Sequence, residues 1–278
     1  MLIDKFYKIF TTTIPASNDY SIYFEKISMD GLEEMHAYSV DKRLYEFFEF
    51  SAFSEIAETK EYINKLLRRM EGKPEEIKSQ YWFVRKRSDD SLVGTAGLTS
   101  LNFDRKSIEW GYGIDPKLWG TGYILQIQEI LKQYVFEILK LNRLHGITMV
   151  DNKRTIESVI ASGMQFEGII RSYYCKDNNF IDGWQYSMTR EDYKKLLEDS
   201  SLVTPNIEKE EIINVVQSIL KEEIISSDSN IENTLTWDSL SHMIIMVNLK
   251  EMLGVEFNPS EIAEATSISN IYELIKKS

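Results

Sequence analysis

The chain is poor in the residue types on which several classes of protein depend. It has 278 residues but one cysteine, Cys175, which excludes a disulfide framework and a cysteine-rich metal site. Its three histidines, His36, His145 and His242, lie far apart without the spacing of metal ligands, which argues against a metal enzyme. Apolar stretches of membrane-spanning length are missing, and residues 1–8 lack the apolar run of a signal peptide. A cytoplasmic protein is therefore expected.

Positive charge is also in short supply. Lys and Arg number 32 against 44 Asp and Glu, which gives a formal net charge of −12. Such a balance argues against nucleic acid or an anionic membrane as the main partner. The charge is uneven, because residues 207–278 carry 13 acidic and 5 basic residues, so that −8 of the −12 belongs to the C-terminal quarter. Hydrophobic residues make up 43% of the chain, enough for a proper core.

Prolines number five, and one of them marks a domain boundary. Pro205 lies in the polar segment 198–206, which separates two stretches of different hydrophobic periodicity. The length of the chain is sufficient for one large domain or two small ones. We therefore predict an N-terminal domain at residues 1–198, a linker at 199–206 and a C-terminal domain at 207–278.

The N-terminal segment mixes strand and helix patterns. Strands that form hairpins early and alternate with helices late are typical of an α+β domain with a mixed sheet. The expected strands cover residues 20–28, 81–86, 92–98, 107–114, 143–150, 165–174 and 180–188. The expected helices cover residues 30–39, 54–70, 120–140 and about 154–161.

The C-terminal segment has a purely helical pattern. Apolar residues recur at helical spacing in residues 208–225 and again in 239–253, and a last helix is expected near 268–276. Three amphipathic helices in about 70 residues indicate a small all-α bundle.

A glycine-containing turn between a predicted strand and a predicted helix is the first candidate for a binding site. It covers residues 114–123, with Gly120 and Gly122 placed where the backbone can approach a ligand closely. The first N–H groups of the helix and its dipole would then point at an anion, for which pyrophosphate is the natural occupant. A plain tight turn before a helix is the alternative, and a bare Gly-x-Gly does not decide between the two.

From Glu109 to Gly122 the sequence resembles the acetyl-CoA signature of the GNAT superfamily of N-acetyltransferases, most closely the branch that acetylates ribosomal-protein N-termini. The resemblance covers roughly residues 20–195 and implies a mixed, mostly antiparallel sheet with flanking helices. Further matches are Leu141–Leu144, Asn152, Thr155, Gly163, Glu167–Gly168, Asp182 and Tyr186–Ser187. Departures from the family pattern are Lys117 for Arg, Thr155 for Ser and Met164 for Phe.

The resemblance also implies a cofactor and the residues that bind it. The cofactor is acetyl-CoA or another acyl-CoA, held by the turn and by the pantetheine-contacting Asn152. Lys117 keeps the positive charge of the family's arginine but loses its bidentate fork. The implied cofactor-binding residues are Ile114, Lys117, Trp119, Gly120, Thr121, Gly122, Tyr123 and Asn152.

Transfer from a thioester to an amine needs a base, donors for the oxyanion and an acid for the leaving thiolate. The resemblance implies Glu167 as the first choice for the base and Glu109, on the preceding strand, as the second. Each could instead be an ordinary carboxylate on a solvated strand face, and His145 on an apolar strand is more typical of a core histidine than of a base. The candidates for the acid are Thr148, Tyr173 and Tyr174.

The second candidate site is Ser239, in the run Thr236–Leu240 at the start of a predicted helix. Asp and Ser also favour helix N-caps, so a capping role is the alternative. The whole of residues 207–278 resembles an acyl or peptidyl carrier protein. This implies 4′-phosphopantetheine on the Ser239 hydroxyl, attached by a phosphopantetheinyl transferase, and other acyl-processing enzymes as possible partners. An acidic carrier can be steered to basic patches on such enzymes.

Three functions are compatible with these features. The first is acyl transfer from a pantetheine thioester, on CoA or on the carrier, to a small-molecule amine such as an amino sugar or an amino acid. The second is loading of the carrier, in which the acyl group moves from CoA to the thiol of the arm on Ser239. The third is non-catalytic, with the GNAT fold serving as a docking platform for the carrier.

Overall fold

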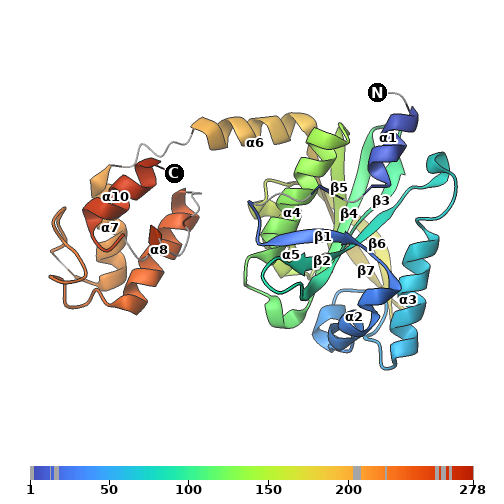
Figure 1. Cartoon of the computed structure of the whole chain (residues 1–278), viewed down its shortest axis with the longest axis horizontal. Coiled ribbons are helices and arrows are strands. Elements are labelled where there is room, and N and C mark those ends of the chain that lie inside the picture. The colour runs from blue at the N-terminus through green and yellow to red at the C-terminus, as the bar shows by residue number, and fades with distance from the viewer. Residues whose placement is uncertain are drawn as a thin grey trace. The chain divides into compact units, whose positions relative to one another are not determined.

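The computed structural model describes residues 3–12, 14–15, 19–202, 208–222, 224–253, 257, 261–262 and 265–277 of the chain (Figure 1). The chain divides into two compact units, residues 1–194 and 195–278. Helix α6 (Arg190–Leu202) runs across this division, so residues 199–202, expected as the start of the linker, are helical. Residues 203–206 lie outside the described residues. No described helix combines the length and apolarity needed to span a bilayer.

The first unit is built on a seven-stranded sheet with the order β1-β2-β3-β4-β5-β7-β6. Every neighbouring pair is antiparallel except β4 and β5, which confirms the expected mixed, mostly antiparallel sheet. The strands are β1 (Ile22–Lys26), β2 (Gln80–Lys86), β3 (Leu92–Asn102), β4 (Ser107–Ile114), β5 (Arg143–Met149), β6 (Gln165–Lys176) and β7 (Asn179–Thr189).

Helices cover both faces of this sheet (Figure 1). Successive side chains of a strand point to opposite faces, and neighbours in β2 show the two layers. Phe83 packs against Gly31, next to α2, whereas the Trp82 ring meets the Tyr134 ring at a centroid distance of 6.1 Å, next to α4. The helices are α2 (Leu32–Ser39) and α3 (Ile56–Arg68) on the first face, and α4 (Tyr123–Gln133) and α5 (Lys153–Ala161) on the other.

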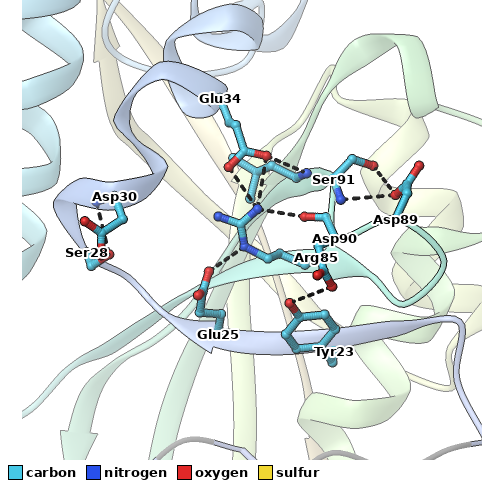
Figure 2. A network of polar contacts seen from close by, with 10 residues as sticks. Tyr23, Glu25, Ser28, Asp30, Glu34, Arg85, Asp89, Asp90 and Ser91 are labelled. Atoms are coloured by element: carbon cyan, nitrogen blue, oxygen red, sulfur yellow. Dashed lines mark hydrogen bonds and ion pairs between the residues drawn. The ribbon is translucent and has the colours of Figure 1, made fainter.

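A polar network joins the β2–β3 hairpin to β1 and α2 (Figure 2). The Arg85 side chain, 11% exposed, forms ion pairs with Glu25 and Glu34 and donates to the Asp90 carbonyl at 2.7 Å. Glu34 also accepts from the Leu92 N–H at 3.3 Å. A partly buried guanidinium is stable only with its donors paired, and here each partner comes from a different element. The network therefore fixes the register of the hairpin against α2.

The first unit differs from the sequence expectations in several elements. Helix α1 (Ile3–Phe10) buries Phe6 and Phe10. The helix expected at 120–140 begins at Tyr123 and closes with a π-helical turn, Tyr134–Ile138. Residues 42–45 form a 3-10 turn that opens an aromatic segment between α2 and α3.

The second unit is a small helical bundle, as expected. Its apolar side chains gather into one cluster around Trp237, which is 1% exposed, with Val216, Leu249 and Ile271 buried beside it. The first helix stops at Leu220, earlier than predicted, because Lys221 adopts the left-handed conformation with φ 54°. The helices are α7 (Lys209–Leu220), α8 (Ser239–Leu253) and α10 (Ile268–Lys277).

Candidate active site

The site lies where β4 and β5 diverge. The two strands pair in parallel only from Ser107 to Glu109 and from Arg143 to His145. Beyond these residues β4 continues along β3 and β5 continues along β7, but not along each other. Residues 110–114 of β4 therefore form no strand pairing with residues 146–149 of β5. Unpaired edges of this kind can hydrogen-bond an extended polar ligand as a further strand would.

A groove of about 80 Å³ occupies one side of this opening. Its walls come from the end of β4, the first turn of α4 and the first turn of α5. Ile114 contributes the apolar floor at 2% exposure, and Trp119 lines the side next to the glycine turn. The groove is also lined by Tyr112, Gly113, Asn152, Arg154 and Thr155. The predicted binding residues Ile114, Trp119 and Asn152 are thus brought together.

The glycine turn prepares the start of α4 for an anion. Gly120 and Gly122 have φ values of 79° and 82°, in the left-handed region. A β-carbon on either would meet no atom within 4 Å, so glycine is required here for the backbone conformation and not for space. Gly122 is the N-cap of α4 and supplies no side-chain cap. The first N–H groups of α4 and the positive end of its dipole are therefore left for a ligand.

The contacts of the loop give the remaining predicted residues of the turn structural roles. Asp115 caps the short 3-10 turn by accepting from the Lys117 N–H at 2.9 Å, while the Lys117 side chain is exposed. The Thr121 hydroxyl donates to the Leu118 carbonyl at 2.6 Å. The Tyr123 ring lies 5.9 Å from the Lys86 ammonium. These contacts hold the loop in shape and keep two ammonium groups near its surface.

Arginines that the sequence patterns did not single out lie beside the turn. The Arg154 guanidinium stacks on the Trp119 ring at 3.8 Å from its centroid, and Arg43 lies 6.0 Å from the same ring. Both arginines line the groove. Arg43 is also paired with Asp41, which holds the pKa of that carboxyl below its usual range. Positive charge at the groove suits a phosphorylated ligand.

Thr148 and Asn152, four residues apart, are in direct contact. The Asn152 carbonyl oxygen caps α5 by accepting from the Thr155 N–H at 3.3 Å, and its amide donates to the Thr148 hydroxyl oxygen at 3.0 Å. Because that oxygen is an acceptor in this bond, the Thr148 proton remains for another partner. The short β5–α5 connection brings the two side chains together at the groove.

A second cavity, of about 210 Å³, lies on the α2–α3 face of the sheet. It shares Leu44, Phe48, Tyr112 and Gly113 with the groove, so the two spaces adjoin across β4. Among the described residues, Glu109 is the one charged side chain that lines it. The position of Glu109 follows from strand alternation, which sends Glu109 and Gly111 to this face. We call this space the acceptor cavity and the first the donor groove.

A bulge in β3 orients Glu109. The β3–β4 register shifts between Thr99 and Asn102, and Ser100 there adopts φ 55°. The Ser100 hydroxyl consequently donates to Glu109 Oε2 at 3.1 Å. Bulges often re-aim side chains next to active sites. The sequence carries no glycine or other signal that would reveal this bulge.

Glu167, the first-choice base, has a different setting. Its two carboxylate oxygens accept from Arg143 at 2.5 Å each, and it also accepts from the Ser187 hydroxyl at 2.8 Å. The Arg143 guanidinium holds the pKa of Glu167 below its ordinary value. Glu167 lines neither the donor groove nor the acceptor cavity. A carboxylate bonded in this way is a weak proton acceptor.

The other candidate acids and His145 lie around the acceptor side. Tyr173 is 46% exposed on β6, and burial together with Glu109 raises its pKa. Tyr174 donates to the Ile147 carbonyl at 2.8 Å, so its proton is engaged. The Nδ1 atom of His145 is buried without a hydrogen-bond partner among the described residues, and burial lowers the pKa of the ring. His145 is thus neither a satisfied core histidine nor a charged one.

Tyr112 is the functional candidate that sequence reasoning missed. Its hydroxyl oxygen accepts from the Gln128 amide, and the same amide donates to Ser158 at 2.8 Å. Burial raises the pKa of Tyr112 to about 12, so the phenol keeps its proton at neutral pH. Trp110 and Tyr112 alternate along β4 like ordinary core aromatics, which is why the pattern carried no functional signal.

In the second unit, Ser239 is the first residue of α8. Its backbone is helical, and its side chain lies outside the described part of the chain. The capping role belongs to its neighbours, because Asp238 accepts from the Ser241 N–H and the Ser241 hydroxyl accepts from the Asp238 N–H, both at 2.8 Å. This is a reciprocal capping box, and it does not need Ser239.

The helix that follows Ser239 is apolar on its surface. Met243, Ile244 and Val247 are each more than 40% exposed, and the first turn of α8 carries no acidic residue. Other segments of this unit carry acidic residues, such as the start of α7 with Glu210 and Glu211. Steering by the acidic surplus would act at a distance, whereas the surface beside the serine offers apolar contact.

Two family profiles match the chain, one for each unit. The acetyltransferase (GNAT) domain matches residues 22–165, more than half of the chain. The phosphopantetheine attachment site family matches residues 210–275.

Curated relatives match the first unit. The chain is 28% identical over 109 residues to the uncharacterized N-acetyltransferase YoaA of Bacillus subtilis (strain 168), covering 39% of this chain and 62% of that protein. It therefore spans less than two thirds of the length of that relative. It is 21% identical over 169 residues to the uncharacterized N-acetyltransferase p20 of Bacillus licheniformis, covering 60% of this chain and 92% of that protein.

Solved structures share the fold of the first unit at low identity. A GNAT-family acetyltransferase from Bacillus anthracis superposes with a TM-score of 0.55 at 20% identity, covering 65% of this chain and 99% of that chain. Spermidine N-acetyltransferase from Vibrio cholerae, in complex with CoA and spermine, gives 0.53 at 18% identity, covering 63% and 98%. A GCN5-related N-acetyltransferase from Brucella melitensis gives 0.59 at 16%, covering 66% and 82%.

These matches and the site agree on the identity of both units. The first unit has a mixed sheet with two divergent strands and matches the GNAT domain, and the second is a helical bundle that matches the phosphopantetheine attachment family. The chain belongs to the GNAT acetyltransferases, which are acyl-transferring enzymes, and joins to that domain a C-terminal domain with a phosphopantetheine attachment site.

Proposed function

We propose that the first unit transfers a short acyl group from a pantetheine thioester to a small-molecule amine. The observation that carries the proposal is that the donor groove and the acceptor cavity adjoin at Tyr112. The donor groove lies beside a turn suited to phosphate, and a single carboxylate among the described residues, Glu109, lines the acceptor cavity. A thioester entering along the donor groove and an amine entering the acceptor cavity would meet across β4. Holding both reactants in this way converts a bimolecular step into a unimolecular one.

Glu109 is proposed as the base in preference to Glu167. An amine enters as its ammonium form, and Glu109 lies where it can pair with that charge and then take one proton. The free amine nitrogen attacks the thioester carbonyl carbon and forms the C–N bond. Backbone N–H groups on the unpaired edge of β4 are suited to stabilise the oxyanion that develops.

Tyr112 is proposed as the acid. Of the four residues that line both spaces, Leu44, Phe48, Tyr112 and Gly113, it alone has a side chain that can donate a proton. Its hydroxyl lies toward α4 and α5, the side of the donor groove, because Gln128 binds it there. When the C–S bond breaks, the thiolate would receive the Tyr112 proton, and the second proton of the attacking nitrogen, lost as the amide forms, would restore the Tyr112 hydroxyl. Thr148, held by Asn152, would add a second hydrogen bond near the thiol.

The donor would be acyl-CoA or an acyl group on the carrier, because both present the same pantetheine arm. We propose Ser239 as the attachment point of that arm, supported by its place at the start of α8 within the family match. A phosphopantetheinyl transferase would attach it. Tethering would raise the effective concentration of the arm at the donor groove wherever the linker allows it to reach.

Two glutamines replacing the two candidate glutamates test the proposed chemistry. With acetyl-CoA and an amine acceptor, Glu109→Gln should lower kcat/KM by about 10²–10⁴-fold, because it removes the base. Glu167→Gln is the matched control, since it makes the same chemical change outside both spaces, and its kcat/KM should stay within a few-fold of the native value. Release of the CoA thiol and acylation of the amine are measured together.

The result that would reverse the assignment is a large loss in Glu167→Gln with Glu109→Gln unaffected. Failure of the native protein to acylate any amine, with and without the arm on Ser239, would contradict the amine-acylation proposal itself. Appearance of the acyl group on the Ser239 arm in intact-protein mass spectra, in place of the amine, would support carrier loading instead.

A further inference from the structure

We infer that the acceptor is a compact aryl-alkyl monoamine without a carboxylate, of the size of phenethylamine. The inference rests on the proposed function and concerns the chemical class of the amine. It follows from four properties of the acceptor cavity: its aromatic wall, its volume, its single charge and a hydroxyl without a well-formed hydrogen bond.

The wall of the cavity is predominantly aromatic. The segment between α2 and α3 supplies Tyr45, Phe48 and Phe50, whose rings contact one another at centroid distances of 5.4–5.6 Å. Tyr62 of α3 packs on Phe50 at 5.8 Å. Aromatic faces suit both a flat apolar ring and an ammonium group. The ring faces themselves offer no hydrogen bonds to the hydroxyl groups of an amino sugar, which would depend on the tyrosine and threonine hydroxyls of the wall.

The volume limits the acceptor to a small molecule. An apolar protein cavity of about 150 Å³ holds one benzene molecule. At about 210 Å³, the acceptor cavity has room for a ring and a short aminoalkyl arm. A long polyamine would leave most of its ammonium groups without a partner in a space of this size, because burying an unpaired charge is costly.

The charges of the cavity argue against an amino acid. Glu109 can neutralise one ammonium group, and none of the lining residues described is Lys, Arg or His. The guanidinium of Arg69 lies behind the wall and donates to the Tyr81 hydroxyl at 3.0 Å. An acceptor carboxylate would therefore be buried beside Glu109 without a cation to pair with it. Decarboxylation of an aromatic amino acid is the class of reaction that would supply such an amine.

One hydroxyl on the wall lacks a well-formed hydrogen bond. Tyr38 is 4% exposed and lines the cavity, and its hydroxyl makes no hydrogen bond of ordinary geometry among the described residues, although Thr95 interacts with it. A buried hydroxyl in this state is uncommon, because it forfeits the bonds that it makes to water in the unfolded chain. A hydroxyl on the ring of the acceptor would satisfy it, so tyramine should be preferred to phenethylamine.

A panel of amines tests the inference on the full-length protein. With acetyl-CoA, kcat/KM for phenethylamine and tyramine should exceed that for phenylalanine, glucosamine and spermidine at least tenfold. Phenylalanine is the matched comparison, since it adds only a carboxylate to phenethylamine. In Tyr38→Phe, the ratio of kcat/KM for tyramine to that for phenethylamine should fall to about one. Phenethylamine alone should also raise the melting temperature, whereas spermidine should not.

The outcomes separate this inference from the proposed function. If spermidine, glucosamine or phenylalanine is acetylated as well as or better than phenethylamine, the acceptor class is wrong while amine acylation stands. If no amine of the panel is acetylated, and none raises the melting temperature, both proposals fail. Retention of the tyramine preference in Tyr38→Phe would contradict the role given to the Tyr38 hydroxyl.

Discussion

At the scale of single residues, the ion pair of Glu167 with Arg143 makes the stability of the first unit depend on pH. The folded-state pKa of Glu167 lies below its ordinary value of 4.5, so the pair stabilises the fold above that pH and loses its contribution as pH falls through the folded pKa. We expect Glu167→Gln to cost roughly 1 kcal/mol at pH 7, a small figure because the pair is partly exposed. Denaturant unfolding followed at several pH values measures the difference.

The control for this prediction is Glu157→Gln, which changes an exposed carboxylate of α5 in the same unit. Its effect on unfolding should be small at every pH. A stability difference for Glu167→Gln that grew toward pH 3 would contradict the assignment of the ion pair.

The same residues mark how far the sequence could identify the site. Thr148 and Asn152 were named from the family resemblance, and the short strand-to-helix turn between them brings their side chains into contact. The resemblance ranked Glu167 before Glu109 as the base, whereas the proposal for Glu109 rests on a bulge in β3 and on the hydrogen-bond partners of each carboxylate. Both hydrogen bonds join residues on different strands, and the local sequence around each residue does not indicate its partner.

At the scale of elements, the start of α4 is the part of the site most sensitive to backbone change. Alanine at Gly122 would adopt a strained left-handed conformation or shift the helix start, although its β-carbon meets no neighbour. We expect Gly122→Ala to raise KM for acetyl-CoA about tenfold, equivalent to about 1.4 kcal/mol, with kcat changed less. Steady-state kinetics with varied acetyl-CoA measures this.

Gly72→Ala is the matched control, since Gly72 is also left-handed, with φ 123°, but is remote from the turn in sequence and lines neither space of the site. It should lower the melting temperature without altering KM for acetyl-CoA. Equal KM in the native protein and Gly122→Ala would show that the turn does not bind the donor.

The ends of helices and strands could be predicted from the sequence where capping or turn residues mark them, and less well elsewhere. The limits of β4 and α8 were predicted correctly, because turn residues flank the strand and Asp238 caps the start of the helix. The helix expected from residue 120 starts at Tyr123, since two left-handed glycines cannot be helical. Its π-helical end kept nearly the same apolar spacing as an α-helix, so periodicity could not reveal it.

At the scale of the whole molecule, the polar segment with Pro205 and the change in hydrophobic periodicity predicted two domains, and the chain forms two compact units, each with its own core. Hydrophobic periodicity did not predict α6, because its sequence is largely polar. This helix begins in the first unit and ends in the second. The acidic surplus was correctly assigned to the second unit, but not to a face of it, since helix faces are decided by packing around Trp237.

The separate cores lead to a prediction for the full-length chain. Trp237 is 1% exposed and donates from its indole to His242 at 3.2 Å, so Trp237→Ala should remove about 3–5 kcal/mol from a small bundle and unfold it. Addition of phosphopantetheine, followed by intact-protein mass spectrometry, should then fail. Acetylation of the amine from free acetyl-CoA should persist, because the first unit keeps its own core.

Ser239→Ala is the control, since it should abolish the mass addition without unfolding the bundle, which far-ultraviolet circular dichroism checks. Should amine acetylation from acetyl-CoA fall in Trp237→Ala but not in Ser239→Ala, the fold of the carrier, and not its arm, would be required by the transferase. Unchanged acetylation in both variants would mean that each unit folds and functions on its own core, and that the arm matters only when it carries the acyl group.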